Sequence, residues 1–466
     1  MQYELCRYGS IEIGDRTLSE RFAKALQQLG SNPEASVRKA CGDPGQSKAV
    51  YRLVGNEKFT IEAIDKVQHE KTVERIKESG ETVILMPQDT TVLNYTNLEE
   101  AQGLGPIGSN HQSKGILLHS ALALQTNGKP LGIASQKIWV RTPEGEVERS
   151  ASQKRERNRE RSIEEKESYC WLETMERAEE GLTEKQTIIH ICDREGDIYE
   201  FYEKASQEGR KFLVRRVQNR KIQDEEEKFL QGFLDKQPVA GEMKVHIPYD
   251  SHTKRRKRDA QLEIRYGKVT ILRPSGGKDT DKLEKAVTVQ VMSAQEINVP
   301  EDAEGISWQL ITNLDVQDVE TARMYIGWYS KRWMIETFHY TLKSGCTVEK
   351  LQYDSASKLM KLIGMYSIIA ALIMWITYLA RTDPEASCES EFTPREWKML
   401  YCVAKKTKKP PEKPPTIFQV VILIAMLGGF SGYKSSGFPG VKSIWWGWTK
   451  FDAILQASEF IANFVG

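Results

Sequence analysis

The sequence has little cysteine and no paired-cysteine motif. Its seven cysteines are scattered along 466 residues, and no C-x-x-C pair occurs. An odd, dispersed set argues against a disulfide framework and a thiolate zinc site, and it favours a reducing, cytoplasmic setting. The first ten residues include Glu4 and Arg7 and no apolar run, so we expect no signal peptide.

The chain also lacks an excess of either charge. It has 66 Lys and Arg against 65 Asp and Glu, a net charge of +1. Any nucleic-acid-binding surface must therefore be a local patch rather than a field of the whole molecule. The composition, 39% apolar and 28% charged, is typical of a soluble globular enzyme and excludes a disordered chain. At about 100–200 residues per domain, the length predicts two to four domains.

One apolar run, residues 362–380, is long enough to cross a bilayer. It contains 19 residues without a charge. We interpret it as a buried helix of a large domain, because the next apolar run, 417–430, is shorter and contains Gln419. We therefore expect no membrane association.

Residues 1–70 show the pattern of small helices. Leu18, Phe22, Leu26 and Leu29 form a helical stripe that ends at Gly30. Basic residues lie outside this stripe, and the segment is either a DNA-binding module or a solvated helical cap. Charge alone does not separate the two. The candidate phosphate contacts are Arg16, Arg21, Lys48 and Arg52.

Residues 81–218 alternate short β-branched runs with helical stretches, which predicts an α/β core with a mixed sheet. Strands are expected at 82–86, 115–124, 131–140, 187–192 and 211–217. Trp308 begins a further strand. The last hundred residues are predicted to be helical, with a proline-rich loop at 405–415.

Residues 219–305 are polar and strand-rich, and we interpret them as an insertion in this core. Five adjacent cations near the centre cannot be buried together, so we expect them on a loop or an exposed hairpin. They favour phosphate contact over a merely solvated turn. These residues are Lys254, Arg255, Arg256, Lys257 and Arg258.

Three acids occupy informative positions. Asp89 and Asp193 each follow a predicted strand, and Glu336 lies on a long helix predicted from about 316 to 343. Two strand carboxylates and one helix carboxylate can converge to hold two Mg²⁺ about 4 Å apart for in-line phosphoryl transfer. Strand-end aspartates also serve as caps and turn formers, so position alone leaves both interpretations open.

The predicted helix places further chemistry beside Glu336. On an ideal helix, Tyr329, Arg332, Glu336 and Lys343 fall within an arc of about 60°. Such a face offers a carboxylate for metal, two cations for phosphates and a phenol that can donate or stack. The alternative is a solvated face with an Arg332–Glu336 pair.

These segments together resemble the DDE transposases of the insertion-sequence-four family, the group that includes the transposase of transposon Tn-five. The resemblance covers most of the chain and rests on an ordered set of motifs. They are the helix signature Tyr329-Ser-Lys-Arg332-Trp333-Met-Ile-Glu336 with His339 and Lys343, the acid motifs Gln88-Asp89-Thr90-Thr91 and Cys192-Asp193-Arg194-Glu195-Gly196-Asp197, the stretch Gly103-Leu104-Gly105-Pro106-Ile107-Gly108, and the N-terminal Gly14-Asp15-Arg16, Ala40-Cys41-Gly42-Asp43 and Ala49-Val50-Tyr51-Arg52.

The resemblance implies an RNase H-like core interrupted by a β-rich insertion, with a helical DNA-binding domain before it and a helical dimerisation domain after it. The expected bounds are 1–70, 71–365 with the insertion at 219–305, and 366–466. It implies Asp89, Asp193 and Glu336 as the catalytic, metal-binding triad for Mg²⁺ or Mn²⁺.

The resemblance also implies a set of DNA contacts. Tyr329, Arg332 and Lys343 would contact the transposon-end backbone. Trp308 would stack on a flipped base, with core packing as the alternative.

The leading hypothesis is a cut-and-paste DNA transposase that acts as a homodimer on two transposon ends and then on target DNA. It would nick one strand, form and open a hairpin, and transfer the strand to the target, in the bacterial cytoplasm and on the nucleoid when bound. The alternatives are a metal-dependent nuclease of the same fold without strand transfer, and an inactive DNA-binding regulatory copy. A tyrosine recombinase would need Tyr329 as a covalent nucleophile. The histidines form no H-E-x-x-H motif.

Overall fold

The computed structural model describes residues 13, 15–108, 112–142, 151–247, 258–301, 304–432 and 438–465. The chain divides into two compact units, which we call the terminal unit and the central unit. The terminal unit comprises Met1–Gly80, Thr90–Pro143 and Ile335–Gly466, and the central unit comprises Glu81–Asp89 and Glu144–Met334. Strand β1 contributes its first half to the central unit and its second half to the terminal unit.

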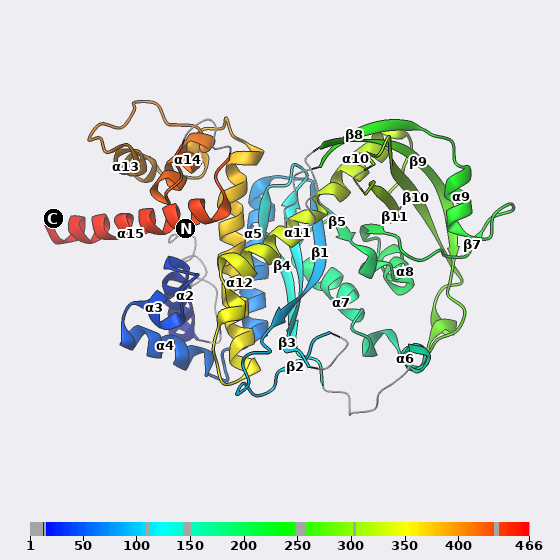
Figure 1. Ribbon diagram of the computed structural model, residues 1–466, viewed down its shortest axis with the longest axis horizontal. Helices are drawn as coiled ribbons and strands as arrows, with labels where there is room; N and C mark the ends of the chain where they lie inside the picture. Colours follow the sequence, from blue (N-terminus) through cyan, green and yellow to red (C-terminus); the bar gives the residue numbers. More distant parts are fainter. Residues whose placement is uncertain are drawn as a thin grey trace. The chain divides into compact units, whose positions relative to one another are not determined.

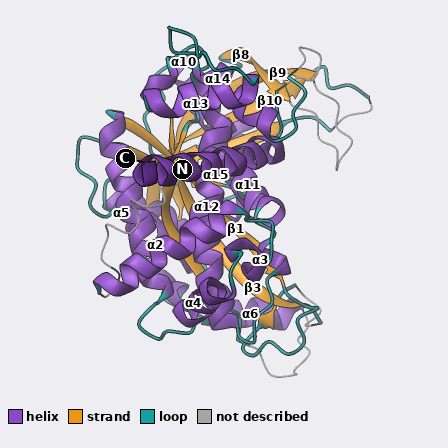
Figure 2. Cartoon of the chain, turned by 90° about the vertical axis from the view of Figure 1, so that its left-hand side faces the viewer, coloured by secondary structure: helices purple, strands orange, loops and turns teal. Residues whose placement is uncertain are grey.

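The described strands form a mixed sheet (Figures 1 and 2). Their hydrogen-bonded order is β2-β3-β1-β5-β6-β11-β10-β9-β7, with β4 on β3 and β8 on β9. Strands β1, β5 and β6 are parallel, and β6, β11, β10 and β9 follow in antiparallel pairs. The sheet confirms the predicted mixed α/β class with an RNase H-like arrangement.

The predicted insertion lengthens this sheet instead of forming a separate layer. Its long strands β9 and β10 pair over twelve positions, and β10 also pairs with β11 of the core. Helix α9 lies against β9 and β10. The central-unit elements are α6 (Ala151–Glu160), α7 (Tyr169–Ala178), β5 (Thr187–Cys192), α8 (Tyr199–Gln207), β6 (Lys211–Arg215), β7 (Ile222–Gln223), α9 (Leu230–Lys236), β8 (Gly241–Ile247), β9 (Arg258–Leu272), β10 (Ala286–Ile297), β11 (Ser307–Thr312) and α10 (Val319–Tyr329).

The terminal unit confirms the prediction of helical N- and C-terminal segments. Side chains cap several of these helices; for example, Asp15 accepts a hydrogen bond from the Leu18 N–H at 2.8 Å. Its elements are α2 (Arg16–Ser31), α3 (Val37–Cys41), α4 (Pro44–Val54), α5 (Ile61–Ser79), the second half of β1 (Val83–Asn94), β2 (Gly105–Pro106), β3 (Lys114–Gln125), β4 (Pro130–Trp139), most of α11 (Trp333–Tyr340), α12 (Ala356–Thr382), α13 (Pro394–Lys405), α14 (Ile417–Leu427) and α15 (Val441–Val465).

The apolar run at 362–380 lies in α12, the central helix of the terminal unit. By length and composition α12 could cross a membrane, but 89% of the most apolar 18-residue stretch of this helix is buried inside the protein. It packs against β4, α5, α14 and α15. The burial explains why a helix apolar on every side is needed here.

Helices α14 and α15 cross with their backbones in close contact. A Cβ added to Gly447 would stand 1.6 Å from the Ile424 carbonyl oxygen, and one added to Gly428 would stand 1.9 Å from the Ser443 oxygen. No other residue type fits at either position without displacing a helix. The two glycines therefore set the spacing of the C-terminal helices.

The structure corrects two expectations about secondary structure. Strand β1 does not end at Met86 but continues to Asn94 through the β-branched residues of Asp89-Thr-Thr-Val, so Asp89 lies within the strand. The helix predicted over 316–343 is broken: α10 ends at Tyr329, a 3₁₀ turn covers Ser330–Arg332, α11 follows, and a π-helical turn covers Thr341–Gly345. The ideal-helix arc of 60° therefore does not apply.

Two buried histidines in the terminal unit generate a pH-dependent stability. Burial lowers the pKa of His119 and of His339 to about 3, and the positive charges of His339 and Lys137 add to the effect on His119. Unfolded histidine titrates near pH 6.5. As the pH falls below that value, the unfolded chain takes up protons first, so stability is complete above about pH 6.5 and is lost between about pH 6.5 and 3.

We predict that the free energy of unfolding falls between pH 7.5 and pH 5 by about 2 kcal/mol for each of these histidines. His119→Asn should remove about half of that dependence, measured by urea denaturation at both pH values. His246→Asn, at a half-exposed histidine on β8, is the matched control and should leave the slope unchanged. An unaltered slope in His119→Asn would contradict the assignment.

Candidate active site

Two aspartates stand at adjacent strand positions in the central unit. Strands β1 and β5 pair in parallel, with Met86 opposite His190 and Pro87 opposite Ile191. Continued by two residues, this register aligns Asp89 with Asp193. Neighbouring strands lie about 4.8 Å apart, so the extended register places the two aspartates at neighbouring backbone positions where β5 ends.

The turn that follows β5 is closely packed. The Asp193 side chain accepts a hydrogen bond from the Glu195 N–H at 2.8 Å. A Cβ added to Gly196 would stand 2.4 Å from the Cys192 Cβ and 3.2 Å from the Trp171 ring. Glycine is therefore required at position 196 for the turn to fold back against the strand end, and this holds Asp193 in place.

Several charged groups of the central unit lie near the Cys192 thiol, at the end of β5. Burial raises the pKa of the Cys192 thiol, the nearby carboxylates of Asp193 and Asp89 raise it further, and the Arg332 guanidinium lowers it. All three charges thus act on one buried sulfur atom. Arg332 thus lies near the same thiol as the two aspartates, and its guanidinium is a group suited to bidentate phosphate binding.

Trp308 and Tyr329 form an aromatic pair beside these charges. Their rings meet edge to face with centroids 5.5 Å apart. Tyr329 is only 3% exposed; burial raises its pKa, and the cations Arg332 and Arg215 partly offset that rise. A buried phenol held in its neutral form is poorly suited to act as a covalent nucleophile, which disfavours the tyrosine recombinase hypothesis.

The remaining residues of the helix signature lie in the terminal unit. Glu336 is an exposed residue of α11, and Lys343 is half-buried in the π-helical turn. The structure thus brings Asp89, Asp193 and Arg332 together within one unit and places Glu336 and Lys343 in the other.

The donor set fits a hard divalent cation. Carboxylate oxygens are the ligands that Mg²⁺ and Mn²⁺ prefer, and protein sites often hold Mg²⁺ with one or two carboxylates plus substrate phosphates. Asp89 and Asp193 supply two such groups. In the parts of the chain that the structure describes, no group of three or more His, Cys, Asp or Glu is clustered to hold a metal.

A buried hydrogen-bond chain connects β1 with β5 close to the two aspartates. Gln88 Nε2 lies 3.0 Å from His190 Nδ1, and His190 Nε2 lies 2.7 Å from Glu179. Because an amide nitrogen can only donate, His190 accepts at Nδ1 and donates from Nε2 to the carboxylate. Arg210 binds the other Glu179 oxygen at 3.0 Å. This chain fixes the residue before Asp89 against β5.

Asp197 is a second anchor with a fully buried side chain. It belongs to the second acid motif of the sequence, but no local pattern indicated its role. Its side chain accepts hydrogen bonds from the Tyr202 hydroxyl at 2.8 Å and from the Val217 and Gln218 N–H groups at 2.7 and 2.6 Å. It also pairs with Arg220. Asp197 therefore ties the turn after Asp193 to the segment that leaves β6 and enters the insertion.

Comparison with known proteins identifies the two ends of the chain. The family described as Transposase Tn5 dimerisation domain matches residues 368–465, and the family described as Transposase DNA-binding matches residues 7–59. The two ends of the chain are therefore similar to the DNA-binding and dimerisation domains of Tn5-type transposases. A cryo-EM structure of the piggyBac transposase synaptic complex with hairpin DNA is similar over 79% of this chain and 67% of that one, with 11% identity and a TM-score of 0.36.

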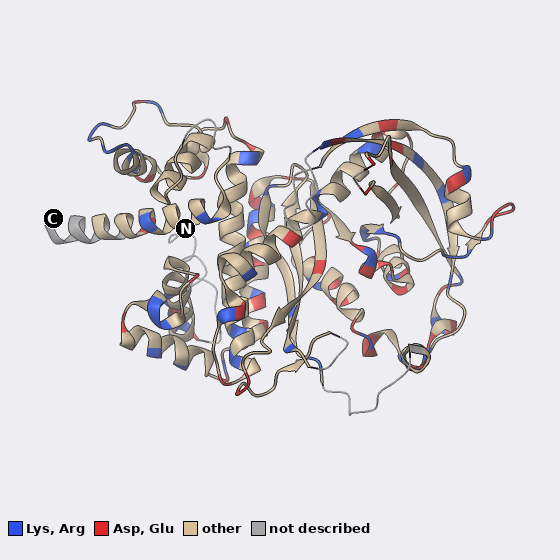
Figure 3. Ribbon diagram, viewed as in Figure 1, with Lys and Arg blue, Asp and Glu red and all other residues tan. Residues whose placement is uncertain are grey.

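The predicted basic residues of the segment that matches the DNA-binding family are exposed. Arg52 and Lys48 lie on α4 and Arg16 and Arg21 on α2, where Arg16 pairs with Glu20 at 2.8 Å. Figure 3 shows Lys and Arg interspersed with Asp and Glu along the chain, in line with the small net charge. DNA contact through these residues stays a prediction.

The structure describes only part of the five-cation cluster. Lys254, Arg255, Arg256 and Lys257 lie outside the described residues. Arg258 begins β9 and is 14% exposed at its side chain, where it pairs with the buried Glu296 at 2.9 Å. Arg258 belongs to a strand that pairs antiparallel with β8, as the hairpin alternative requires, but its side chain is not exposed as expected, because it pairs with a buried carboxylate.

We predict that Arg220→Ala destabilises the central unit by about 3–5 kcal/mol, because the substitution leaves the Asp197 charge buried without its ion-pair partner. Urea denaturation followed by tryptophan fluorescence measures the effect. Arg16→Ala, which breaks an exposed pair, should leave the unfolding midpoint unchanged. Equal midpoints for Arg220→Ala and the wild type would show that the Asp197 anchor carries no stability.

Proposed function

We propose that this chain is a cut-and-paste DNA transposase that cleaves and joins DNA by two-metal phosphoryl transfer. The observation that carries the proposal is the alignment of Asp89 with Asp193 at the end of β5, with the Arg332 charge acting on the same point. The two matched terminal domains support it with a DNA-binding module and a dimerisation module.

Asp89 and Asp193, with Glu336, would hold Mg²⁺ or Mn²⁺. When bound, the metal would neutralise charge at the scissile phosphate and lower the pKa of the attacking water or 3′-hydroxyl. In phosphoryl transfer of this kind the protein forms no covalent intermediate, so no Ser, Cys or Tyr nucleophile is required.

Other residues position the DNA strand in this proposal. Arg332 and Lys343 bind backbone phosphates of the transposon end, and Tyr329 supports Trp308 and Arg332 from its buried position. Trp308 stacks on a base turned out of the duplex, which recovers the stacking energy that a strained hairpin end gives up. Arg52 and the basic residues 254–257 add phosphate contacts, whereas Arg258 is held by Glu296.

The proposed reaction runs on double-stranded DNA in a homodimer that holds two ends. Water attacks a phosphodiester of one strand, which leaves a 5′-phosphate and frees a 3′-hydroxyl, and this hydroxyl attacks the opposite strand to form a hairpin. The hairpin is opened, and the freed 3′ ends attack target DNA. We place this activity in the cytoplasm, on the nucleoid when the protein is bound to DNA.

We predict that Asp89→Asn, Asp193→Asn and Glu336→Gln each reduce cleavage at least about 10³-fold, because several kcal/mol of transition-state stabilisation is lost. End binding should persist. The assay uses purified protein, Mg²⁺ and a labelled duplex carrying the inverted repeats that flank the gene. Glu184→Gln, at an exposed carboxylate, is the matched control and should cleave normally.

The same assay separates the proposal from its rivals. Cleavage without transfer of the labelled end into plasmid DNA would assign a nuclease. Binding without cleavage in the wild type would assign an inactive regulatory copy. Retained cleavage in any of the three variants would overturn that residue's place in the triad.

We predict that Trp308→Ala slows hairpin formation about 10-fold while the first nick proceeds at the wild-type rate, since base–aromatic stacking contributes about 1–3 kcal/mol. Trp308→Phe should restore part of the rate. Separate quantification of nicked and hairpin products checks this. If both steps slow together and the melting temperature drops, Trp308 serves core packing instead.

A further inference from the structure

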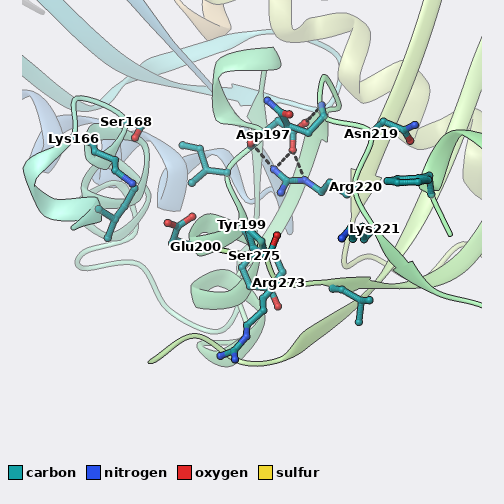
Figure 4. A pocket seen from close by; sticks show the side chains of 16 residues that line it. Lys166, Ser168, Asp197, Tyr199, Glu200, Asn219, Arg220, Lys221, Arg273 and Ser275 are labelled. Atoms are coloured by element: carbon teal, nitrogen blue, oxygen red, sulfur yellow. Dashed lines mark hydrogen bonds and ion pairs between the residues drawn. The ribbon is translucent and has the colours of Figure 1, made fainter. Parts of the chain in front are cut away.

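A pocket of about 470 Å³ lies in the central unit (Figure 4). Its walls come from the start of α8, from the segment between β6 and β7, from the end of β9 and from the turn before α7. None of its lining residues has a place in the proposed catalysis or DNA contacts. Its volume is in the range of small-ligand sites and accommodates one nucleotide.

The pocket has an excess of positive charge. Asp197 and Arg220 line it but neutralise each other. The remaining ionised groups are Lys166, Lys221 and Arg273 against one carboxylate, Glu200. In Figure 4 Lys166 and Lys221 lie on opposite sides, with Arg273 below them.

The two lysines are available to a ligand. Within the described residues neither Lys166 nor Lys221 forms an ion pair, whereas Arg273 is held by the Thr280 and Leu283 carbonyl oxygens at 3.1 Å and by Asp281. A lysine ammonium with no ion-pair partner, at the edge of a cavity, is a suitable phosphate ligand.

The same pocket offers an apolar surface and amide groups. Phe229 lines it with 43% of its surface exposed, so its ring is open to a ligand. Gln218 and Asn219 bring side-chain amides to the lining. An exposed ring, amides and cations in one cavity match a base, its polar edge and its phosphate.

We propose that this pocket binds one nucleotide, with its base against Phe229 and its phosphate at Lys166 or Lys221. Two sources share this chemistry, a free nucleoside phosphate and an unpaired nucleotide of a DNA strand. The site is separate from the proposed catalytic residues, and the inference does not depend on catalysis.

The test measures binding by full-length protein in EDTA, where no metal-dependent cleavage interferes. Deoxyadenosine triphosphate, followed by calorimetry, probes the free nucleotide, and a short single-stranded oligonucleotide, followed by fluorescence anisotropy, probes the strand. The variants are Lys166→Ala with Lys221→Ala, Phe229→Ala and Glu200→Gln. Lys185→Ala, at an exposed lysine outside the pocket, is the control.

With at least one probe, the double lysine variant should bind about 10-fold more weakly and Phe229→Ala about 5-fold more weakly. Glu200→Gln should bind about 2-fold more tightly, because it removes the opposing charge. A response to the triphosphate assigns the free nucleotide. A response confined to the oligonucleotide assigns the strand, and its salt dependence should then weaken by about 0.7 in slope for each lysine–phosphate interaction that the variant removes.

Three results would overturn the proposal. The first is equal binding of both probes by the wild type and the double lysine variant. The second is an equal loss in Lys185→Ala, which would show a general charge effect. The third is an unchanged affinity in Phe229→Ala. All of these are readable whether or not the protein cleaves DNA, so they are distinct from a failure of the proposed function.

Discussion

The parallel pairing of β1 with β5 is the interaction on which the candidate active site depends. Side chains alternate between the faces of a sheet, so a slip of one residue in this register would turn one aspartate away from the other. The protein secures the register twice. Within the sheet, a hydrogen-bond chain joins Gln88 of β1 to His190 of β5 and continues to Glu179 and Arg210. After β5 ends, Gly196 packs on Cys192 and fixes the turn that carries Asp193.

The candidate active site also requires that the insertion be joined rigidly to the end of β5. Asp197 performs that role because its carboxylate binds two backbone N–H groups and Arg220 just beyond β6. The insertion strands then continue the sheet through β11, and Trp308 at the start of β11 comes to lie against Tyr329. Reactions that rely on charge stabilisation need such fixed groups, since movement of the site would cost the energy that catalysis must supply.

Much of this arrangement could be predicted from the sequence, because its signals are local. The alternating β-branched runs marked β3, β4, β5 and β6 to within a few residues, and the apolar stripe of α2 follows from its spacing. Other features had no local signal. Strand β1 continues past Asp89 because its β-branched residues extend the pairing, and the helix through Tyr329 breaks at a 3₁₀ turn that itself contains no proline or glycine. Arg258 pairs with Glu296, which lies 38 residues further along the chain, so neither composition nor local spacing could predict this ion pair.

The sequence by itself determined the residue types and their order: three acids, a Tyr-x-x-Arg-x-x-x-Glu signature, and helical segments at both ends that match transposase DNA-binding and dimerisation domains. The tertiary structure decided which of these groups share an environment. It buried Tyr329, aligned Asp89 with Asp193, made Asp197 an anchor, and left an exposed Phe229, an exposed Lys221 and a half-buried Lys166 around one pocket. The reason is physical: residue type and spacing are properties of the chain, whereas burial and charge proximity arise when distant segments pack together.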